Sequence, residues 1–354
     1  MEKEIFNVIG VMSGTSLDGV DLCYVKFNFD HKWHFEIIHC RTESYSDEWH
    51  DKLRSVINLS PSEMISVNVQ YTELLTQIIN RFIEDYSITE IDAICSHGHT
   101  VFHQPENNLT LQIGNLPELK DHLDYTIVCD FRVQDVQLGG QGAPLVPIGD
   151  QLLFSEFDYC LNLGGFANVS FQRNHERIAF DICPVNIVLN HYASQIGLEF
   201  DKDGLEAKRG KVVSELYESL NALDFYQQNP PKSLGLEWVK SHVLPLIDSL
   251  HISVNDVLRT TVEHIAYQIN NHIESDQKTT LLITGGGAYN TFLIERIRNQ
   301  FNGSIVIPKP EIVEYKEALI FAFLGVLRLR NEVNCLKSVT GAKHDHSSGV
   351  IFKA

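Results

Sequence analysis

The chain has 354 residues, of which 44% are hydrophobic and 21% charged, and its formal net charge is -18. This length and composition predict a globular protein of about two domains, and the acidic balance excludes a broad electrostatic surface for nucleic acid. The seven cysteines form no Cys-x-x-Cys pair and no apolar run reaches the roughly 20 residues of a membrane helix, so we expect a soluble cytoplasmic protein with reduced thiols.

The first predicted element is a β-meander over residues 4–42. Apolar, strand-like runs at 6–9 and 22–25 flank a turn at residues 10–21 that reads GVMSGTSLDGVD. Glycine adopts positive φ without steric cost, so this turn can point successive backbone N–H groups at one anion. A phosphate group is the natural ligand for such a turn.

Polar side chains in the same turn extend this interpretation. Three hydroxyls are available as further donors, those of Ser13, Thr15 and Ser16. Asp18 and Asp21 would repel a bare phosphate, which indicates a divalent cation or an attacking water beside it. The alternative is a glycine-rich hairpin turn that binds nothing, and this motif alone does not separate the two.

The chain then alternates between helix and strand. Pro61 begins an amphipathic helix that extends to about Tyr86. Strand-like segments follow at residues 91–96, 109–113 and 126–130. This alternation is typical of an α/β protein with mixed sheets.

Two of these strands end in polar clusters. The first is followed by His97-Gly98-His99, with His103 nearby. This pattern is compatible with a metal site, but no third ligand is evident, so a polar lining is the alternative. After the last strand, Arg132 stands between Asp130 and Asp135, which favours a substrate clamp over a plain ion-pair cluster.

A dense glycine and proline segment at residues 139–144 is the best candidate for a crossing between domains. We therefore predict an N-terminal domain over residues 1–140 and a C-terminal domain over 141–354. The clearest helix of the second domain covers residues 254–273. A final apolar helix near 313–329 is a candidate to pack back on the first domain.

Two later glycine loops are similar in form to the first. The turn Gly164-Gly165 separates two strand-like runs, and a strand at 280–284 leads into Gly285-Gly286-Gly287, with a helix predicted from Thr291. A strand followed by a glycine run and a helix start lets the backbone approach a nucleotide closely. Ordinary P-loop and nucleophile-elbow motifs are absent from the sequence. We infer duplicated domains that close around a nucleotide.

Asp181 is the candidate general base. It follows a strand-like run at residues 177–180 and precedes a break that contains Pro184. A carboxylate at a strand end is a frequent position for a general base. The alternative is an aspartate that caps a helix starting near Pro184, because proline favours the first helical position.

These motifs resemble those of the anhydro-N-acetylmuramic acid kinase family, a branch of the sugar kinase, actin and heat-shock ATPase superfamily. Residues 10–21 match the family pattern G-x-M-S-G-T-S-x-D-G-V-D almost letter for letter. Further matches follow in the family's order along nearly the whole chain: SHG at 96–98, TLQIG at 110–114, DFR at 130–132 with Asp135, GGQGAPLVP at 139–147, NLGGFANVS at 162–170, PPKS at 230–233, GGGAYN at 285–290, EAL at 317–319 and SVTGA at 338–342.

The resemblance implies a fold and an activity. The fold would be the two-domain, actin-like ATPase (ribonuclease H-like) fold, with mixed sheets and an interdomain cleft. The activity would be an ATP- and Mg²⁺-dependent kinase for 1,6-anhydro-N-acetylmuramic acid, a sugar released by cell-wall turnover. Water opens the 1,6-anhydro ring while O6 takes the γ-phosphoryl group, which gives N-acetylmuramic acid 6-phosphate. The resemblance also suggests a homodimer.

Roles for the matching residues follow from the same resemblance. Asp181 would be the base that takes a proton from the attacking water. The ATP phosphates would be held by Gly14, Thr15, Ser16, Leu17, Asp18, Gly19, Val20 and Asp21, with Mg²⁺ reached from Asp18 through water. A second phosphate turn would comprise Gly164, Gly165 and Asn168, and the adenosine side Gly285, Gly286, Gly287 and Asn290. The sugar pocket would be lined by His97, Arg132, Asp135 and Glu317.

The chain departs from the family pattern around the base. Where the family usually has D-T-G-P-G-N, residues 181–186 read DICPVN. Because glycines let a backbone approach phosphate, Cys183 and Val185 are expected to narrow the cleft or reshape the sugar pocket. His99, Asp150 and Leu234 replace the usual Gln, His and Thr. The kinase expectation stands, and the identity of the sugar is left open.

Three alternatives accompany the kinase hypothesis. One is a kinase of another amino sugar, and the second is a phosphohydrolase or ATPase on the same fold that needs no sugar acceptor. The third is a nucleotide-binding regulatory protein that lost catalysis through the changes at residues 182–185. Release of ADP with and without candidate sugars separates these classes.

Overall fold

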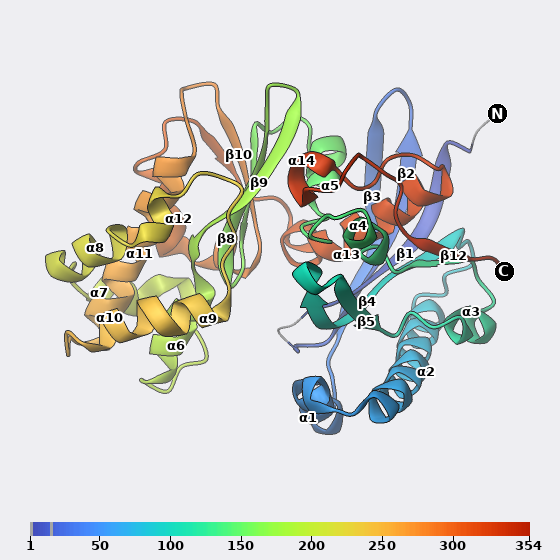
Figure 1. Ribbon diagram of the computed structural model, residues 1–354. Helices are drawn as coiled ribbons and strands as arrows, with labels where there is room; N and C mark the ends of the chain where they lie inside the picture. Colours follow the sequence, from blue (N-terminus) through green and yellow to red (C-terminus); the bar gives the residue numbers. More distant parts are fainter. Residues whose placement is uncertain (1–2, 15–16) are drawn as a thin grey trace. The chain divides into compact units, whose positions relative to one another are not determined.

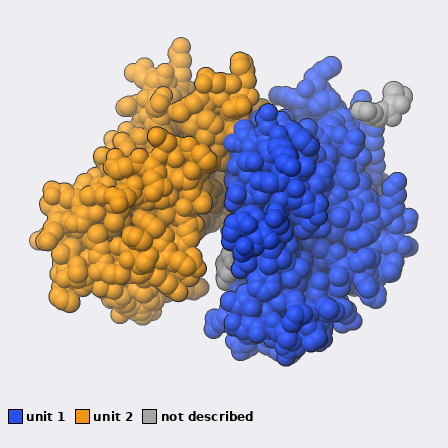
Figure 2. Space-filling model, viewed as in Figure 1, with its two compact units in different colours: residues 1–153, 315–354 blue, residues 154–314 orange. Residues whose placement is uncertain are grey.

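The computed structural model describes residues 3–14 and 17–354, and the chain divides into two compact units (Figures 1 and 2). Unit 1 comprises Met1–Leu153 and Tyr315–Ala354, and unit 2 comprises Phe154–Glu314. These limits differ from the expected division after residue 140. The glycine-rich segment at 139–144 lies within unit 1, where its backbone is bonded to Asp135, as described below.

Unit 1 is built on a seven-stranded mixed sheet with the order β12-β6-β4-β1-β2-β3, and β5 pairs with β4. The first three strands are antiparallel, and β4 and β6 add parallel strands beside β1. The strands are β1 (Ile5–Ser13), β2 (Val20–Phe29), β3 (Trp33–Glu43), β4 (Ala93–Gln104), β5 (Leu109–Ile113), β6 (Ile127–Cys129) and β12 (Val350–Phe352).

One face of this sheet is covered by α2, the long helix of unit 1. Its buried residues recur every three or four positions, which gives the helix one apolar face toward Ile9 and Ile94 of the sheet. Ser60 caps the helix start in a capping box with Glu63. The helices of unit 1 are α1 (Asp47–Ser55), α2 (Pro61–Asp85), α3 (Glu118–Leu123), α4 (Val133–Gln137), α5 (Pro147–Leu153) and α14 (Lys337–Thr340), with α13 (Pro310–Leu329) from Tyr315 onward.

The other face of the sheet is covered by α13. Side chains of neighbouring strand residues point to opposite faces, so Gly10 and Cys95 face away from Ile9 and Ile94. A Cβ on Gly10 would overlap the carbonyl of Ala318 in α13. A Cβ on Gly325 of the same helix would overlap the Cys95 thiol. Small residues on both surfaces therefore allow the helix to lie directly on the strands.

Unit 2 repeats the plan of unit 1. Its five-stranded sheet has the order β11-β10-β7-β8-β9, in which β7, β8 and β9 are antiparallel and β10 and β11 run parallel to β7. The strands are β7 (Tyr159–Leu163), β8 (Phe166–Arg173), β9 (Glu176–Pro184), β10 (Thr280–Thr284) and β11 (Ser304–Val306). The helices are α6 (Asn186–Ser194), α7 (Leu205–Arg209), α8 (Ser214–Asn221), α9 (Leu236–Trp238), α10 (Leu244–Asp248), α11 (Val254–His272) and α12 (Thr291–Arg298).

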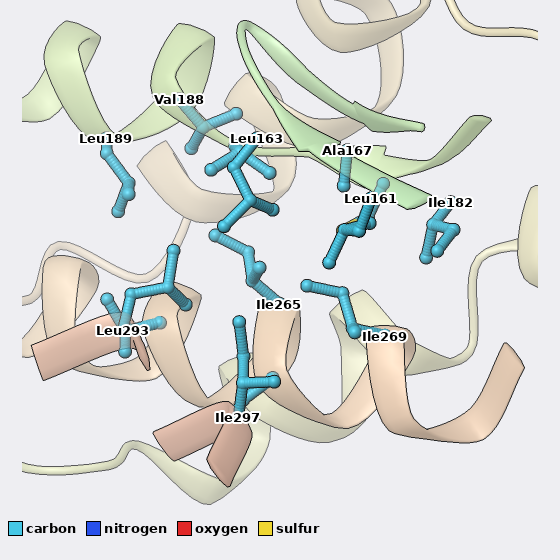
Figure 3. Close-up of a cluster of buried hydrophobic side chains, with 14 of the residues drawn as sticks. Leu161, Leu163, Ala167, Ile182, Val188, Leu189, Ile265, Ile269, Leu293 and Ile297 are labelled. Carbon is cyan, nitrogen blue, oxygen red and sulfur yellow. The ribbon is translucent and has the colours of Figure 1, made fainter. Parts of the chain in front are cut away.

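The core of unit 2 lies between this sheet and helices α11 and α12 (Figure 3). Leu161 of β7, Ile265 of α11 and Ile297 of α12 are all fully buried there. Full burial of a large aliphatic side chain contributes about 1.5–3 kcal/mol. This layer fixes the end of β7, from which the Gly164-Gly165 turn begins.

The two sheets confirm the expected duplication. Each has a three-strand antiparallel meander followed by two parallel strands, β3-β2-β1-β4-β6 in unit 1 and β9-β8-β7-β10-β11 in unit 2. This order is the ribonuclease H-like arrangement, so the expected α/β fold with mixed sheets is confirmed. The interdomain cleft stays a prediction.

Most predicted elements are found with small shifts at their ends. The expected helices at 61–86 and 254–273 are α2 and α11, and the strand at 109–113 is β5. The strand expected at 91–96 continues as β4 to Gln104, because β5 folds back to pair with its second half. Among the described residues, none of the helices combines the length and the apolar character that crossing a membrane requires.

Candidate active site

The first glycine turn is a hairpin between β1 and β2, as predicted. Met12 pairs with Asp21 and Ser13 with Val20 at its base. Thr15 and Ser16, which were predicted to hold phosphate, lie outside the described residues. Leu17 and Gly19 have positive φ of 62° and 156°, and a Cβ on Gly19 would overlap the carbonyl of Glu43.

The side chains around this hairpin divide into anchored and exposed groups. The Ser13 hydroxyl is buried and hydrogen-bonds both Nδ1 of His99 at 2.9 Å and the Tyr45 hydroxyl at 2.6 Å. Burial lowers the pKa of His99 to about 4, so its ring is neutral at physiological pH. Ser13 therefore anchors the end of β1. Asp18 is exposed, and Asp21 accepts a hydrogen bond from Thr42 Oγ1 at 2.6 Å.

His97 lies within β4 and meets Arg132, which follows the end of β6. His97 is buried, and its Nδ1 donates to the Gly98 carbonyl at 2.8 Å. Its Nε2 therefore carries a lone pair, which accepts a hydrogen bond from Arg132 Nε at 2.9 Å. Burial and the nearby Arg132 charge hold the pKa of His97 well below its usual value. The neutral ring thus fixes the guanidinium, while Arg132 Nη1 donates to the Gly142 carbonyl at 2.6 Å.

Glu317 adds a carboxylate to this pair. It lies on α13, four residues before Phe321, whose ring packs on His97 with 4.5 Å between centroids. Residues four apart share a helix face, so Glu317 is on the side of α13 that faces His97 and Arg132. Burial lowers the pKa of Arg132 to about 10, and the Glu317 charge opposes this shift. Arg132 remains charged at neutral pH.

Asp135 has a different environment from the other three predicted sugar residues. It is fully buried, and its Oδ2 accepts a hydrogen bond from the Gly142 backbone N–H at 2.7 Å. Its Oδ1 accepts one from Thr340 Oγ1 at 2.7 Å. In the described part of the chain no ion pair joins Arg132 to Asp130 or Asp135, and Arg132 bonds instead to His97 and Gly142. Asp135 fixes the loop whose carbonyl holds Arg132.

The second glycine turn joins β7 and β8 as predicted. The carbonyls of Gly164 and Gly165 accept hydrogen bonds from the backbone N–H groups of Asn186 and Val185 at 3.2 and 2.8 Å. These bonds tie the turn to the start of α6. Gly165 itself is exposed, so its backbone is the accessible part of the turn.

The third glycine run lies beside the second turn. Thr284 of β10 pairs with Asn162 of β7, and the chain then turns at Gly285, whose φ is 81°. A Cβ on Gly285 would lie 2.5 Å from Oδ1 of Asn162, and a Cβ on Gly287 2.7 Å from Cβ of Leu163. Gly286 is exposed, and a Cβ there would meet only Asn186 Nδ2, at 3.8 Å. The two loops thus form one glycine-rich surface of unit 2.

The two predicted asparagines have distinct positions. Asn290 caps α12, because its Oδ1 accepts from the Leu293 N–H at 2.9 Å. Asn168 is exposed on β8 and pairs directly with Asp181 of β9. A β-bulge separates this pair from Ala167 and Cys183, and bulges commonly re-aim side chains near active sites.

Asp181 lies within β9 and does not cap the following helix. Its Oδ2 accepts a hydrogen bond from the Leu234 N–H at 2.8 Å, and its own N–H donates to the Lys232 carbonyl at 3.1 Å. Burial raises its pKa above the ordinary aspartate value, and the hydrogen bond from Leu234 opposes the shift. A half-buried carboxylate with a raised pKa is suited to accept a proton.

The residues next to Asp181 that differ from the family pattern point into the hydrophobic core. Ile182, Cys183 and Val185 are each 0% exposed and belong to the hydrophobic core of unit 2. The expectation that Cys183 and Val185 reshape the pocket is therefore not supported within this unit, because both side chains pack inward.

Two asparagines that no sequence motif singled out lie beside these glycine loops. Asn186 begins α6, and its Nδ2 donates to the Leu163 carbonyl at 3.4 Å. Asn162 lies between the two glycine loops, with its Nδ2 3.2 Å from a Cβ placed on Gly164. Both are asparagines near the end of a strand or the start of a helix, beside a glycine turn. That position in the sequence could have identified them.

Known proteins of one family are similar to this chain over nearly its whole length. The family model for anhydro-N-acetylmuramic acid kinase matches residues 6–354. A protein of that name from Mannheimia succiniciproducens is 35% identical, over 97% of this chain and 98% of its own length. One from Sulfurimonas denitrificans is 31% identical, over 98% and 99%. A solved structure, the activator of 2-hydroxyisocaproyl-CoA dehydratase from Clostridium difficile with bound ADPNP, is 12% identical with a TM-score of 0.45, over 92% of this chain and 97% of its own.

Proposed function

The chain belongs to the anhydro-N-acetylmuramic acid kinase family, and from this premise we propose that it converts 1,6-anhydro-N-acetylmuramic acid, water and ATP into N-acetylmuramic acid 6-phosphate and ADP. Water adds to C1 and the bond from C1 to O6 breaks. The freed O6 takes the γ-phosphoryl group, and one proton leaves the water. Phosphoryl transfer of this kind depends mainly on positioning and charge stabilisation.

The observation that carries this proposal is the environment of Asp181. Its carboxylate is half-buried, has a raised pKa and is held by the Leu234 N–H at 2.8 Å. We assign to it the proton from the attacking water. Asn168, directly opposite on β8, is placed to orient a polar group beside the base.

The glycine surface of unit 2 fits a nucleotide. Gly286 is exposed and a Cβ there would make only an ordinary contact with Asn186, while Gly285 and Gly287 bring the loop close to the end of β7. Backbone that is free of side chains can approach phosphate and ribose oxygens. We assign the phosphates to Gly165 and to the hairpin at residues 14–21, and the adenosine to Gly286 and its neighbours.

A divalent ion fits the acidic groups of the first hairpin. Asp18 is exposed, so its carboxylate is accessible to a hydrated Mg²⁺, and carboxylate oxygens are preferred ligands of this ion. When bound, Mg²⁺ would neutralise charge on the phosphates. Asp21 is held by Thr42 and is the second acidic group of the hairpin.

The sugar is assigned to the His97, Arg132 and Glu317 group. Arg132 is fixed by two hydrogen bonds and remains charged, so it can bind the carboxylate of the lactyl ether that distinguishes a muramic acid from other amino sugars. Asp135 then acts indirectly, through Gly142. The inward packing of Cys183 and Val185 supports retention of the family's sugar.

An assay of ADP release tests the proposal against its rivals. We expect release that depends on both Mg²⁺ and the 1,6-anhydro sugar, with little release for N-acetylglucosamine or for water alone. Equal turnover without any sugar would instead identify an ATPase. Tight ATP binding with no turnover on a panel of anhydro and reducing amino sugars would identify a regulatory protein.

The cellular location and the oligomeric state of the enzyme are also proposed. We propose a reducing, cytoplasmic location, which is supported by buried thiols such as Cys95, Cys183 and Cys335 that form no disulfide among the described residues. We also propose a homodimer, on the family resemblance alone. Sedimentation of the purified chain measures the second directly.

A further inference from the structure

A buried cluster in unit 1 combines three different potential metal ligands. Asp135, Cys335 and His346 each offer one ligand atom, and these atoms all lie within 4.8 Å of one another. The Cys335 thiol donates a hydrogen bond to Asp135 Oδ1 at 3.0 Å, and His346 Nε2 is 3.5 Å from the same oxygen. All three residues are buried.

Hydrogen bonds hold the three segments that carry this cluster. Cys335 and His346 face each other in a β-bridge, with two backbone hydrogen bonds of 3.1 Å between them. Next to the bridge, Asn334 Nδ2 donates to the Ser348 carbonyl at 2.8 Å, and Ser348 N–H donates to Asn334 Oδ1 at 2.7 Å. The third side chain, Asp135, comes from α4 (Figure 1) and is fixed by Gly142 and Thr340. The ligand atoms are therefore held before any ion arrives.

The histidine ring leaves one nitrogen without a partner. His346 Nδ1 lies 3.1 Å from the His344 carbonyl, which can only accept, so Nδ1 carries the hydrogen. Nε2 of the neutral ring is then a lone pair that faces a carboxylate oxygen. Within the part of the chain that the structure describes, Nε2 has no hydrogen-bond partner. Two acceptors in a buried site repel each other unless a cation lies between them.

We propose that Asp135, Cys335 and His346 form a binding site for one divalent transition-metal ion, with zinc the best match. Imidazole nitrogen, thiolate sulfur and carboxylate oxygen are the three ligand types that Zn²⁺ takes, and Mg²⁺ does not favour sulfur. Binding releases the Cys335 thiol proton. Two negative ligands and one Zn²⁺ give a neutral cluster, which suits a buried position.

The site has a structural consequence for the proposed sugar pocket. Asp135 Oδ1 faces the cluster, whereas its Oδ2 holds Gly142, whose carbonyl holds Arg132. A metal ion would thus tie the C-terminal segment around Cys335 and His346 to the loop that positions Arg132. The ion acts at a distance from the reaction, and its binding can be measured without any kinase assay.

Metal titration of the purified full-length chain tests this site. We expect the metal-free protein to bind one Co²⁺ per chain with a thiolate-to-cobalt absorption band, and one Zn²⁺ by elemental analysis. Cys335→Ser should abolish the band and His346→Gln should weaken Zn²⁺ binding at least about tenfold. His122→Gln and Cys40→Ser are matched controls that alter an imidazole and a thiol outside the cluster, and both should bind like the wild type.

The wild-type protein alone also decides the matter, in case a variant fails to fold. Zinc K-edge absorption spectroscopy of the loaded protein should report one sulfur ligand. A shell of nitrogen and oxygen only would overturn the proposal. The absence of stoichiometric binding would overturn it as well.

Discussion

The Leu234 N–H donates a 2.8 Å hydrogen bond to Oδ2 of Asp181. This bond joins two segments that are 53 positions apart in the sequence and fixes the rotamer of the proposed base. It favours the charged carboxylate, while burial favours the neutral acid, and burial prevails. The base therefore keeps a defined position together with an increased affinity for a proton.

The first prediction concerns Asp181→Asn. The amide oxygen can still accept the hydrogen bond from Leu234, so the fold and ATP affinity should be unchanged, whereas the proton acceptor is lost. We expect kcat to fall by about 10²–10⁴-fold, measured as sugar-dependent ADP release, with ATP affinity followed by calorimetry. A variant with near-normal turnover would remove Asp181 from its assigned role.

The second prediction is the pH dependence of activity. Asp181 acts as a base only when ionised, and its pKa is raised. As pH falls through this raised pKa, kcat/KM should therefore decline, with a midpoint above that of an ordinary aspartate. The pH–rate profile measures this midpoint, with circular dichroism at each pH as a check on folding. Activity that stays level down to pH 4 while the fold is intact would contradict the assignment.

The sequence predicted the local parts of this site and missed the contacts between residues that are far apart in the chain. The hairpins at residues 10–21 and 164–165 and the loop at 285–287 were found, because alternation and glycine turns are local signals. The contact between Leu234 and Asp181 was not predicted. The bond between Cys335 and Asp135, 200 positions apart, was not predicted either, since no local pattern reports such a pairing.

The segment at 139–144 shows why a local signal can also mislead. Its glycine density suggested a crossing between domains. In the structure, a Cβ on Gly140 would overlap the Asp135 carboxylate, and the Gly142 N–H donates to that carboxylate. These glycines serve close packing on a buried acid inside unit 1, and composition alone does not distinguish close packing from a linker.

The third prediction compares two glycines of the same loop. Gly286→Ala makes only an ordinary contact with Asn186, so the unfolding midpoint should be unchanged, but the added methyl group should weaken ATP binding if the backbone contacts the nucleotide. Gly285→Ala is the contrasting variant. Alanine at this position would have to adopt a φ of 81°, and its Cβ would lie 2.5 Å from Oδ1 of Asn162. This strain should cost about 1–3 kcal/mol of stability. Unaltered ATP affinity in Gly286→Ala would argue against this surface as the nucleotide site.

The fourth prediction is acid destabilisation through His264. This buried ring donates from Nδ1 to Asn221 Oδ1 and accepts at Nε2 from the Tyr226 hydroxyl, and burial lowers its pKa to about 3. Between that value and its ordinary pKa near 6.5, the unfolded chain binds the proton and the folded chain does not. Stability contributed by the neutral ring is therefore present above pH 6.5 and lost as pH falls, by about 1.4 kcal/mol at pH 5.5.

Urea unfolding at pH 7.5, 6.5 and 5.5 measures this loss for the wild type and two variants. His264→Gln should be less stable at pH 7.5, because two buried hydrogen bonds change, but should show a smaller dependence on pH. His344→Gln alters an exposed ring and should keep the wild-type slope. An equal slope in all three proteins would exclude His264 as the source.

The last prediction tests how α13 lies on the sheet of unit 1. In an exposed helix interior, Gly→Ala stabilises by up to about 1 kcal/mol. At Gly325, the new methyl group would overlap the thiol of Cys95, which is fully buried on β4, so we expect Gly325→Ala to destabilise by about 1–3 kcal/mol.

Because the overlap is with sulfur, Cys95→Ala combined with Gly325→Ala should recover part of the loss. Urea unfolding of both single variants and the double variant gives the coupling energy between the two positions. Additive effects would mean that helix and strand separate easily here. That result would contradict the direct packing of α13, which also places Glu317 beside Arg132.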